Sequence, residues 1–79
     1  MSPRAKLRQI VHAIIYASED VYVGECVEIA VITQGRTLAK TVNNLQEAAT
    51  LYFEGEDLAA LGFSSRPRMR IKFDFPLNL

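Results

Sequence analysis

The chain has 79 residues, with nine basic and nine acidic side chains and one histidine, so its formal net charge at pH 7 is zero. A chain of this length forms one domain that buries roughly 60–65% of its unfolded surface, so self-association would add stability. The zero net charge argues against bulk attraction to nucleic acid or to an anionic membrane, but it allows a local charged patch. The hydrophobic content of 49% is too high for a disordered chain.

The single cysteine, Cys26, and the single histidine, His12, cannot provide an internal disulfide or a Cys/His zinc site. The apolar stretch after the basic N-terminus is short and contains His12, so we expect neither a secretory signal peptide nor a membrane span. We therefore expect a cytoplasmic protein without a bound metal or cofactor. Residues 1–5 are expected to fray.

Three segments in the first half of the chain have the composition of strands. Residues 6–17 carry β-branched and large side chains on both faces, which predicts a central strand. After a polar turn, residues 21–26 predict a second strand paired back as a hairpin, with Gly24 at a bulge or a close backbone approach. Residues 29–33 predict a third strand that Gly35 ends, at a position where a left-handed backbone would be easy.

A helix is predicted from about Thr37 to Glu54. Thr37 suits the N-cap position, although Lys40 stands where a capping box would need Glu or Gln. Apolar side chains recur at helical spacing along this stretch and predict an amphipathic helix long enough to cover three strands. The stripe consists of Leu38, Val42, Leu45, Ala49, Tyr52 and Phe53. Leu51 lies on the opposite, polar face, either as an ordinary exposed leucine or as a contact with a second copy or a partner.

The segment after the helix is rich in turn signals. Gly55 is predicted to interrupt the helix, and residues 56–61 to form one further turn or a short second helix. Gly62 suits the C-cap of that turn, with Phe63 as its apolar anchor. Residues 64–67 predict a linker.

The last segment has the most regular pattern of the chain. Apolar and charged side chains alternate strictly, which predicts a half-buried strand bracketed by Pro67 and Pro76. The apolar residues are Met69, Ile71, Phe73 and Phe75, and the charged ones are Arg68, Arg70, Lys72 and Asp74. The predicted order is strand-strand-strand-helix-strand. This is an α+β fold with the last strand parallel to a member of the hairpin sheet and one main helix packed on one face.

No set of residues predicts catalysis or metal binding. A nuclease of the ribonuclease H type needs converging carboxylates, but residues 6–17 contain neither Asp nor Glu. His12 has no serine or acidic neighbour in the local sequence, so a structural or surface role is favoured over that of a general base. For Cys26, a buried inert thiol is favoured over a reactive nucleophile. We therefore predict that the protein is not an enzyme.

Charges of opposite sign are separated along the chain. Arg68, Arg70 and Lys72 share one face of the last strand, and Lys6 and Arg8 extend this patch if the last strand neighbours the first. The basic face is either a solvated surface that discourages edge-to-edge pairing or a site for RNA or an acidic protein.

The end of the helix is acidic, and no basic residue occurs between Thr41 and Ser65. The acidic residues are Glu47, Glu54, Glu56 and Asp57. Such a surface suits a basic RNA-binding protein or the basic strand of a second copy. The separation of charge within a neutral chain favours head-to-tail or reciprocal self-contacts.

Three motifs, in this order, resemble the HicB-type antitoxin domain over about residues 7–57. They are Tyr22-Val23-Gly24-Glu25-Cys26, then Thr33-Gln34-Gly35-Arg36-Thr37-Leu38, then Asn44-Leu45, Glu47-Ala48 and Leu51-Tyr52 within the helix. The resemblance implies a truncated ribonuclease-H-like sheet without the catalytic carboxylates. It also implies that the domain binds and masks a small mRNA-cleaving toxin, HicA, and assembles into dimers or tetramers.

We expect a single HicB-like domain over residues 1–79, with its core at about residues 6–76 and no separate DNA-binding domain. It would mask a HicA-like toxin or act as a solitary homo-oligomer. The alternative is a nucleic-acid-binding module that uses the basic face of the last strand. The predicted partner or oligomer contacts are Leu51, Glu47, Glu54, Arg68, Arg70 and Lys72.

Overall fold

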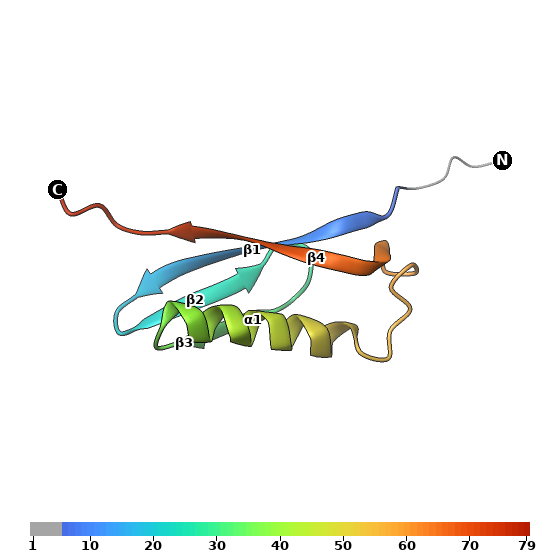
Figure 1. The fold of residues 1–79 in the computed structure, drawn as a ribbon, viewed down its shortest axis with the longest axis horizontal. Coiled ribbons are helices and arrows are strands. Elements are labelled where there is room, and N and C mark those ends of the chain that lie inside the picture. The colour runs from blue at the N-terminus through green and yellow to red at the C-terminus, as the bar shows by residue number, and fades with distance from the viewer. Residues whose placement is uncertain (1–5) are drawn as a thin grey trace.

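The computed structural model describes residues 6–79 and shows a four-stranded mixed sheet with one helix on one face (Figure 1). Its elements, in chain order, are β1 (Arg8–Ser18), β2 (Val21–Cys26), β3 (Ile32–Gly35), α1 (Leu38–Phe53) and β4 (Phe63–Asp74). The strand order is β3-β2-β1-β4, with β1 antiparallel to β2 and parallel to β4. The α+β class, the central first strand and the parallel last strand are confirmed. The predicted fraying of residues 1–5 lies outside the described residues.

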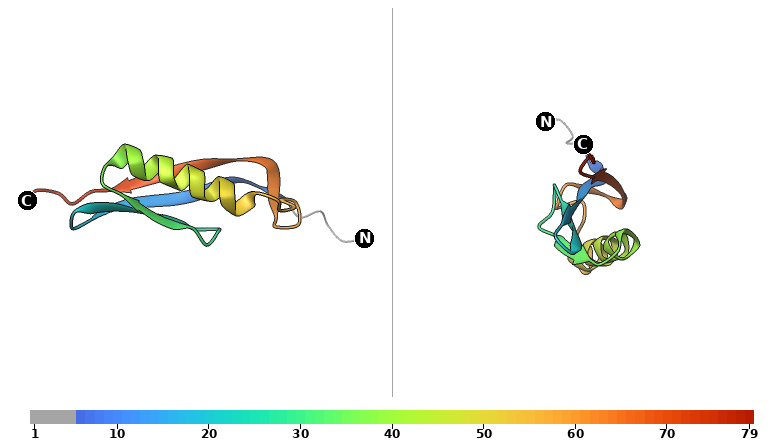
Figure 2. Two further views of the ribbon diagram at one scale, coloured as in Figure 1. Left: turned by 90° about the horizontal axis from the view of Figure 1, so that it is seen from below. Right: turned by 90° about the vertical axis from the view of Figure 1, so that its left-hand side faces the viewer.

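The core lies between the sheet and α1. Val11, Ala13 and Ile15 of β1 are buried on the helix side, and the even-numbered residues of β1 face the other side, which no element among residues 6–79 covers (Figure 2). From α1, Leu45 and Ala49 complete this layer. Each large aliphatic side chain buried in this way stabilises the fold by about 1.5–3 kcal/mol.

Two glycines of the sheet let α1 approach closely. A Cβ at Gly24 would lie 2.7 Å from Cδ1 of Leu45, so the predicted close backbone approach is confirmed. A Cβ at Gly35 would lie 2.7 Å from Oγ1 and 2.8 Å from the backbone N of Thr41. The sheet beneath these two helix residues therefore tolerates no side chain.

The prediction of a left-handed backbone at Gly35 is wrong. Among the described residues, the glycines with positive φ are Gly55, at 75°, and Gly62, at 89°. Gly35 is needed for space, because the first turn of α1 lies directly against it. Thr41, the helix residue above it, is completely buried and donates its hydroxyl to the backbone oxygen of Thr37 at 2.9 Å.

The helix begins and ends where the sequence predicts. Thr37 is the N-cap and accepts from the backbone N–H of Lys40 at 3.1 Å. The prediction that Tyr52 belongs to the buried apolar stripe is wrong, since this residue is 40% exposed. The buried face of α1 is centred on Thr41 and Leu45, and Tyr52 lies at its border.

The segment between α1 and β4 forms turns, the first of the two alternatives predicted for residues 56–61. Gly62 has the left-handed backbone of a C-cap residue, and Phe63 after it is 4% exposed, as predicted. The rings of Phe53 and Phe63 meet edge to face at 5.1 Å, which joins the end of α1 to the start of β4.

The predicted third strand is displaced. β3 begins at Ile32, and residues 27–31 form a loop closed by a hydrogen bond from the N–H of Cys26 to the oxygen of Val31 at 2.9 Å. Ile29 and Val31 are buried in the core. These two residues are apolar because their side chains enter the core from the loop. They do not belong to a strand.

The fourth strand is longer at its start than predicted and ends at Asp74, before Phe75. Phe63 pairs with Arg8 and Arg68 pairs with Ile10, so the register shifts between them. The predicted linker at residues 64–67 is therefore an irregular part of β4 that bulges relative to β1. Its proline, Pro67, is tolerated because β4 is an edge strand, where a missing N–H donor breaks no ladder.

We predict that Gly35→Ala destabilises the fold by about 1–3 kcal/mol, because the added carbon would clash with backbone atoms at the start of α1 that cannot move independently. In a domain of this size the melting temperature should fall by at least about 4 °C, measured by circular dichroism. Arg36→Ala, at the exposed neighbouring position, is the control and should stay within about 0.5 kcal/mol. Equal melting temperatures for Gly35→Ala and the wild type would contradict the role assigned to Gly35.

Candidate functional site

Two hydrogen bonds join His12 on β1 to Glu28 in the loop after β2. The backbone N–H of His12 donates to Oε1 of Glu28 at 2.7 Å, and the ring Nδ1 of His12 lies 2.5 Å from Oε2. The Glu28 side chain is 8% exposed and that of His12 is 47% exposed. The carboxylate therefore binds a backbone donor of the central strand where β2 ends and anchors the loop of residues 27–31.

The surroundings of Glu28 favour its charged form. Burial on its own would raise the pKa of the Glu28 carboxyl, but hydrogen bonds from the ring and backbone of His12 and from its own backbone hold that pKa below the ordinary value of 4.5. This pair leaves no local signal in the sequence, because the two residues are 16 positions apart. The register of the hairpin does indicate that the two residues lie close together. Continuing it beyond Ala13 and Cys26 places Val27 opposite His12, and the N–H of Val27 does donate to the His12 oxygen at 2.8 Å.

Cys26 packs against the core but is only partly buried. Burial and the nearby negative charge of Glu28 raise the pKa of its thiol above 9.0, so the thiol is protonated at neutral pH and is a weak nucleophile. Within residues 6–79, no three His, Cys, Asp or Glu side chains are grouped as a metal site would require. The described part of the chain also has no helix with the length and apolar character needed to cross a membrane.

Two glutamates and a leucine lie together on the outer side of α1. We call this set the acidic face, and it consists of Glu47, Leu51 and Glu54. The spacing of four and three residues places these side chains on one side of the helix. All three are exposed, and Leu51 is 61% exposed. Among residues 6–79 His12 and Glu28 are the one basic and acidic pair of side chains in contact, so neither glutamate of the acidic face pairs with another described residue. Leu51 and Glu47 also line a shallow hollow on this face.

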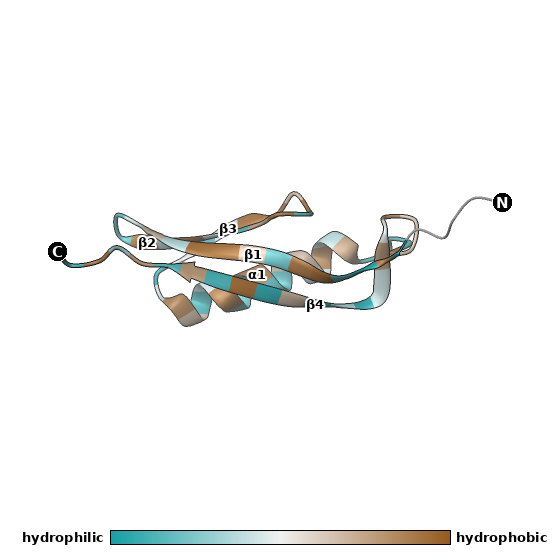
Figure 3. Ribbon diagram, turned by 90° about the horizontal axis from the view of Figure 1, so that it is seen from above, coloured by the Kyte–Doolittle hydropathy of each residue, from teal (hydrophilic) through white to brown (hydrophobic). Residues whose placement is uncertain are grey.

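The other predicted contacts form a basic stripe, Arg68, Arg70 and Lys72, on the uncovered side of β4. Hydrophilic and hydrophobic positions alternate along this strand (Figure 3). These residues pair in register with Ile10, His12 and Ile14 of β1. The predicted extension through Lys6 and Arg8 does not continue in register, because Lys6 precedes β1 and the pairing shifts after Arg8. The stripe and the acidic face lie on opposite sides of the sheet, so the structure does not bring them into one site.

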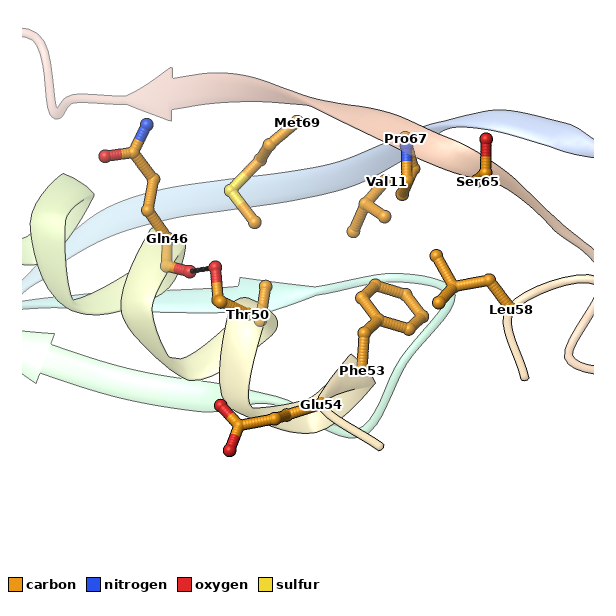
Figure 4. A pocket seen from close by; sticks show the side chains of 10 residues that line it. Val11, Gln46, Thr50, Phe53, Glu54, Leu58, Ser65, Pro67 and Met69 are labelled. Atoms are coloured by element: carbon orange, nitrogen blue, oxygen red, sulfur yellow. Dashed lines mark hydrogen bonds between the residues drawn. The ribbon is translucent and has the colours of Figure 1, made fainter. Parts of the chain in front are cut away.

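A groove of about 470 Å³ runs between α1 and β4 (Figure 4). Met69 points from β4 towards the helix, and Phe53 points from the helix towards β4. The remaining lining residues are Val11, Ala49, Leu58 and Pro67 on the apolar side and Gln46, Thr50, Glu54 and Ser65 among the polar ones. The groove exists because α1 packs on β3 and β2 and leaves the helix side of β4 partly uncovered. Sequence reasoning missed it, since the lateral position of a helix on a sheet leaves no periodic signal.

Comparisons with models of protein families, with curated proteins and with solved structures found no match. The resemblance to HicB-type antitoxins therefore stays a prediction from the motifs.

We predict that Glu28→Gln lowers the free energy of unfolding at about pH 7 by about 1–2 kcal/mol, because it weakens two hydrogen bonds to a charged acceptor. The folded-state pKa of Glu28 is depressed, so its contribution is fully present above 4.5 and is lost as the pH falls through the lower, folded value. Urea unfolding at about pH 7 and about pH 3 measures this difference, which should shrink in acid. An equal difference at both pH values would show that the Glu28 charge contributes nothing.

Proposed function

We propose that this protein is a non-catalytic, cytoplasmic interaction domain of the HicB type, whose acidic face binds and masks a small basic ribonuclease resembling HicA. The observation that carries the proposal is the exposed set of Glu47, Leu51 and Glu54, in which two carboxylates that pair with no described residue flank an apolar side chain. The order of the sequence motifs supports the choice of partner. The free thiol of Cys26 suits a reducing compartment.

The electrostatics of α1 support a cationic partner. Its last turn carries no basic residue, so the negative end of the helix dipole is not neutralised there. Glu54, Glu56 and Asp57 then add negative charge at the same end, and all three are exposed. This arrangement is unfavourable for the isolated helix, and a positively charged surface brought against it would relieve the repulsion.

Masking follows from competition for the same charges. A ribonuclease attracts the RNA backbone with lysine and arginine side chains. An acidic helix face that occupies those side chains excludes the phosphates and speeds association by charge complementarity. Leu51, at the centre of the acidic face, offers the apolar contact from which water is excluded and on which binding energy concentrates.

The test is titration calorimetry of the chain against the small basic protein encoded beside it, with RNA cleavage by that protein as a second readout. We expect binding that weakens with salt and inhibition of cleavage. Glu47→Lys and Glu54→Lys should each weaken binding roughly tenfold. Asp20→Lys is the matched control, because Asp20 lies in the exposed hairpin turn at the far end of the molecule from the end of α1 (Figure 1), and it should leave binding unchanged.

The absence of binding to any neighbour-encoded product would contradict the toxin proposal and leave a solitary homo-oligomeric domain. A second candidate, nucleic-acid binding, is favoured by the three exposed cations of the basic stripe, which make no ion pair with a described residue. It predicts a salt-dependent mobility shift of single-stranded RNA that Arg68→Ala with Arg70→Ala abolishes. The absence of a mobility shift at low salt would contradict nucleic-acid binding.

A further inference from the structure

The C-terminal residues continue the alternation of β4 beyond the end of the sheet. Phe73 and Phe75 stack with their ring centres 6.1 Å apart and are 43% and 53% exposed. Leu77 and Leu79 follow at the same spacing of two and are 79% and 109% exposed. Four apolar side chains thus recur at every second position of a segment whose last five residues are all exposed and project past the sheet (Figure 1).

The strand that carries this segment has a free edge. β4 ends the strand order, so its outer N–H and C=O groups have no partner strand among the described residues. Its first half is protected against pairing by Pro67 and by the register shift. From Arg68 to Asp74, however, the strand pairs regularly with β1 and contains neither proline nor glycine, so its outer edge is available for a further strand.

We propose that β4 and the C-terminal segment pair antiparallel with the same segment of a second copy, around a two-fold axis at Phe73, to form one continuous eight-stranded sheet. Antiparallel pairing about this axis sets Ile71 opposite the second copy's Phe75, and Met69 opposite its Leu77. Between them Pro76 lies opposite Arg70 and contributes no N–H donor to the pairing. Odd-numbered residues then face odd-numbered ones, so all apolar side chains lie on the helix side of the joined sheet.

The same register lets the C-terminal segment cover the groove. Met69 and Pro67 form the β4 wall of the groove. In the pairing Met69 lies opposite Leu77 of the second copy, and Leu79 of that copy continues past the paired part of the edge towards Pro67. Two exposed apolar surfaces, which are far apart in one chain, therefore cover each other in the dimer. By symmetry each copy covers the groove of the other, so the contact closes as a dimer and does not propagate.

Charge decides the position of the axis. With Phe73 on the axis, Lys72 lies opposite Asp74 of the second copy, twice per dimer, and no like charges of the strand face each other. Moving the axis by one residue would set Lys72 or Asp74 against its own copy. Moving it to Ile71 would set Arg70 against Lys72. Among the registers centred on residues 71–75, this one alone sets opposite charges against each other without also opposing like charges.

This inference specifies the self-association within the proposed function and does not depend on toxin binding. A chain that dimerises in this way and binds no ribonuclease would support the dimer and contradict the toxin. A chain that binds a ribonuclease and stays monomeric would support the toxin proposal and contradict the dimer.

The test is the dimer dissociation constant from sedimentation equilibrium of the full chain. Leu77→Ser with Leu79→Ser should weaken the dimer roughly tenfold or more, because both residues lose burial in each copy. These positions lie outside β4, so the melting temperature of the dilute monomer should not change. Val27→Ser is the control, an apolar residue 74% exposed in another loop, and should leave the constant unchanged.

A charge swap tests the register. Lys72→Glu and Asp74→Lys should each weaken the dimer roughly tenfold, because each sets like charges opposite each other twice, and the double variant should restore it. Both positions are exposed on the uncovered side, so folding is unaffected. A monomeric wild type at about 100 µM, a dimer insensitive to the leucine substitutions, or a double variant no tighter than the single ones would overturn the proposal.

Discussion

The contact of Thr41 and Leu45 with Gly35 and Gly24 is the constraint on which the rest of the structure depends. Both helix side chains are fully buried, and each occupies space that a Cβ on the strand below would fill. Both glycines lie on the β2 and β3 side of the sheet, so the close approach draws α1 to that side. A single helix that packs on β3 and β2 leaves β4 without close cover. One pair of glycines thus determines where the core is dense and where the groove opens.

The uncovered surfaces follow from this lateral position. The helix side of β4 keeps Met69 and Ile71 only partly buried, and it continues into an apolar segment that no part of the described chain covers. The outer side of α1 is left to carboxylates, and the uncovered side of the sheet to the basic stripe. Each surface differs in chemistry: apolar along the edge of β4, negative on α1 and positive across β4. A small domain of this kind offers several separate contacts for other chains, and the described residues include no cluster of metal ligands.

Features that depend on local periodicity were predictable from the sequence. The alternation from Arg68 to Asp74 and the helical spacing of Leu38, Val42 and Leu45 each predict their element, because burial of one face selects side chains along the chain itself. Features that depend on distances between elements were not. Gly35 is an example. A glycine required for space and a glycine required for a left-handed backbone look the same in one sequence.

The same limit applies to the candidate sites. The exposure of Leu51 is predictable because its position opposite the apolar stripe is a local property, and the structure places it on the outer face of α1. The pairing of His12 with Glu28 depends on carrying the hairpin register past the end of β2, and the groove depends on the lateral position of α1. Buried Ile29 and Val31 show a further ambiguity, because an apolar loop that enters the core has the composition of a strand.

Hydrogen–deuterium exchange of the backbone amides of residues 68–79 at low and high protein concentration tests most directly whether a second chain covers the open side of β4. We expect these amides to exchange slowly at high concentration and to lose protection on dilution, while the amides of β1 and β2 stay protected throughout. Fast exchange of residues 75–79 at every concentration, with no change in β4, would contradict the central claim that the uncovered edge and groove are built for contact with another chain.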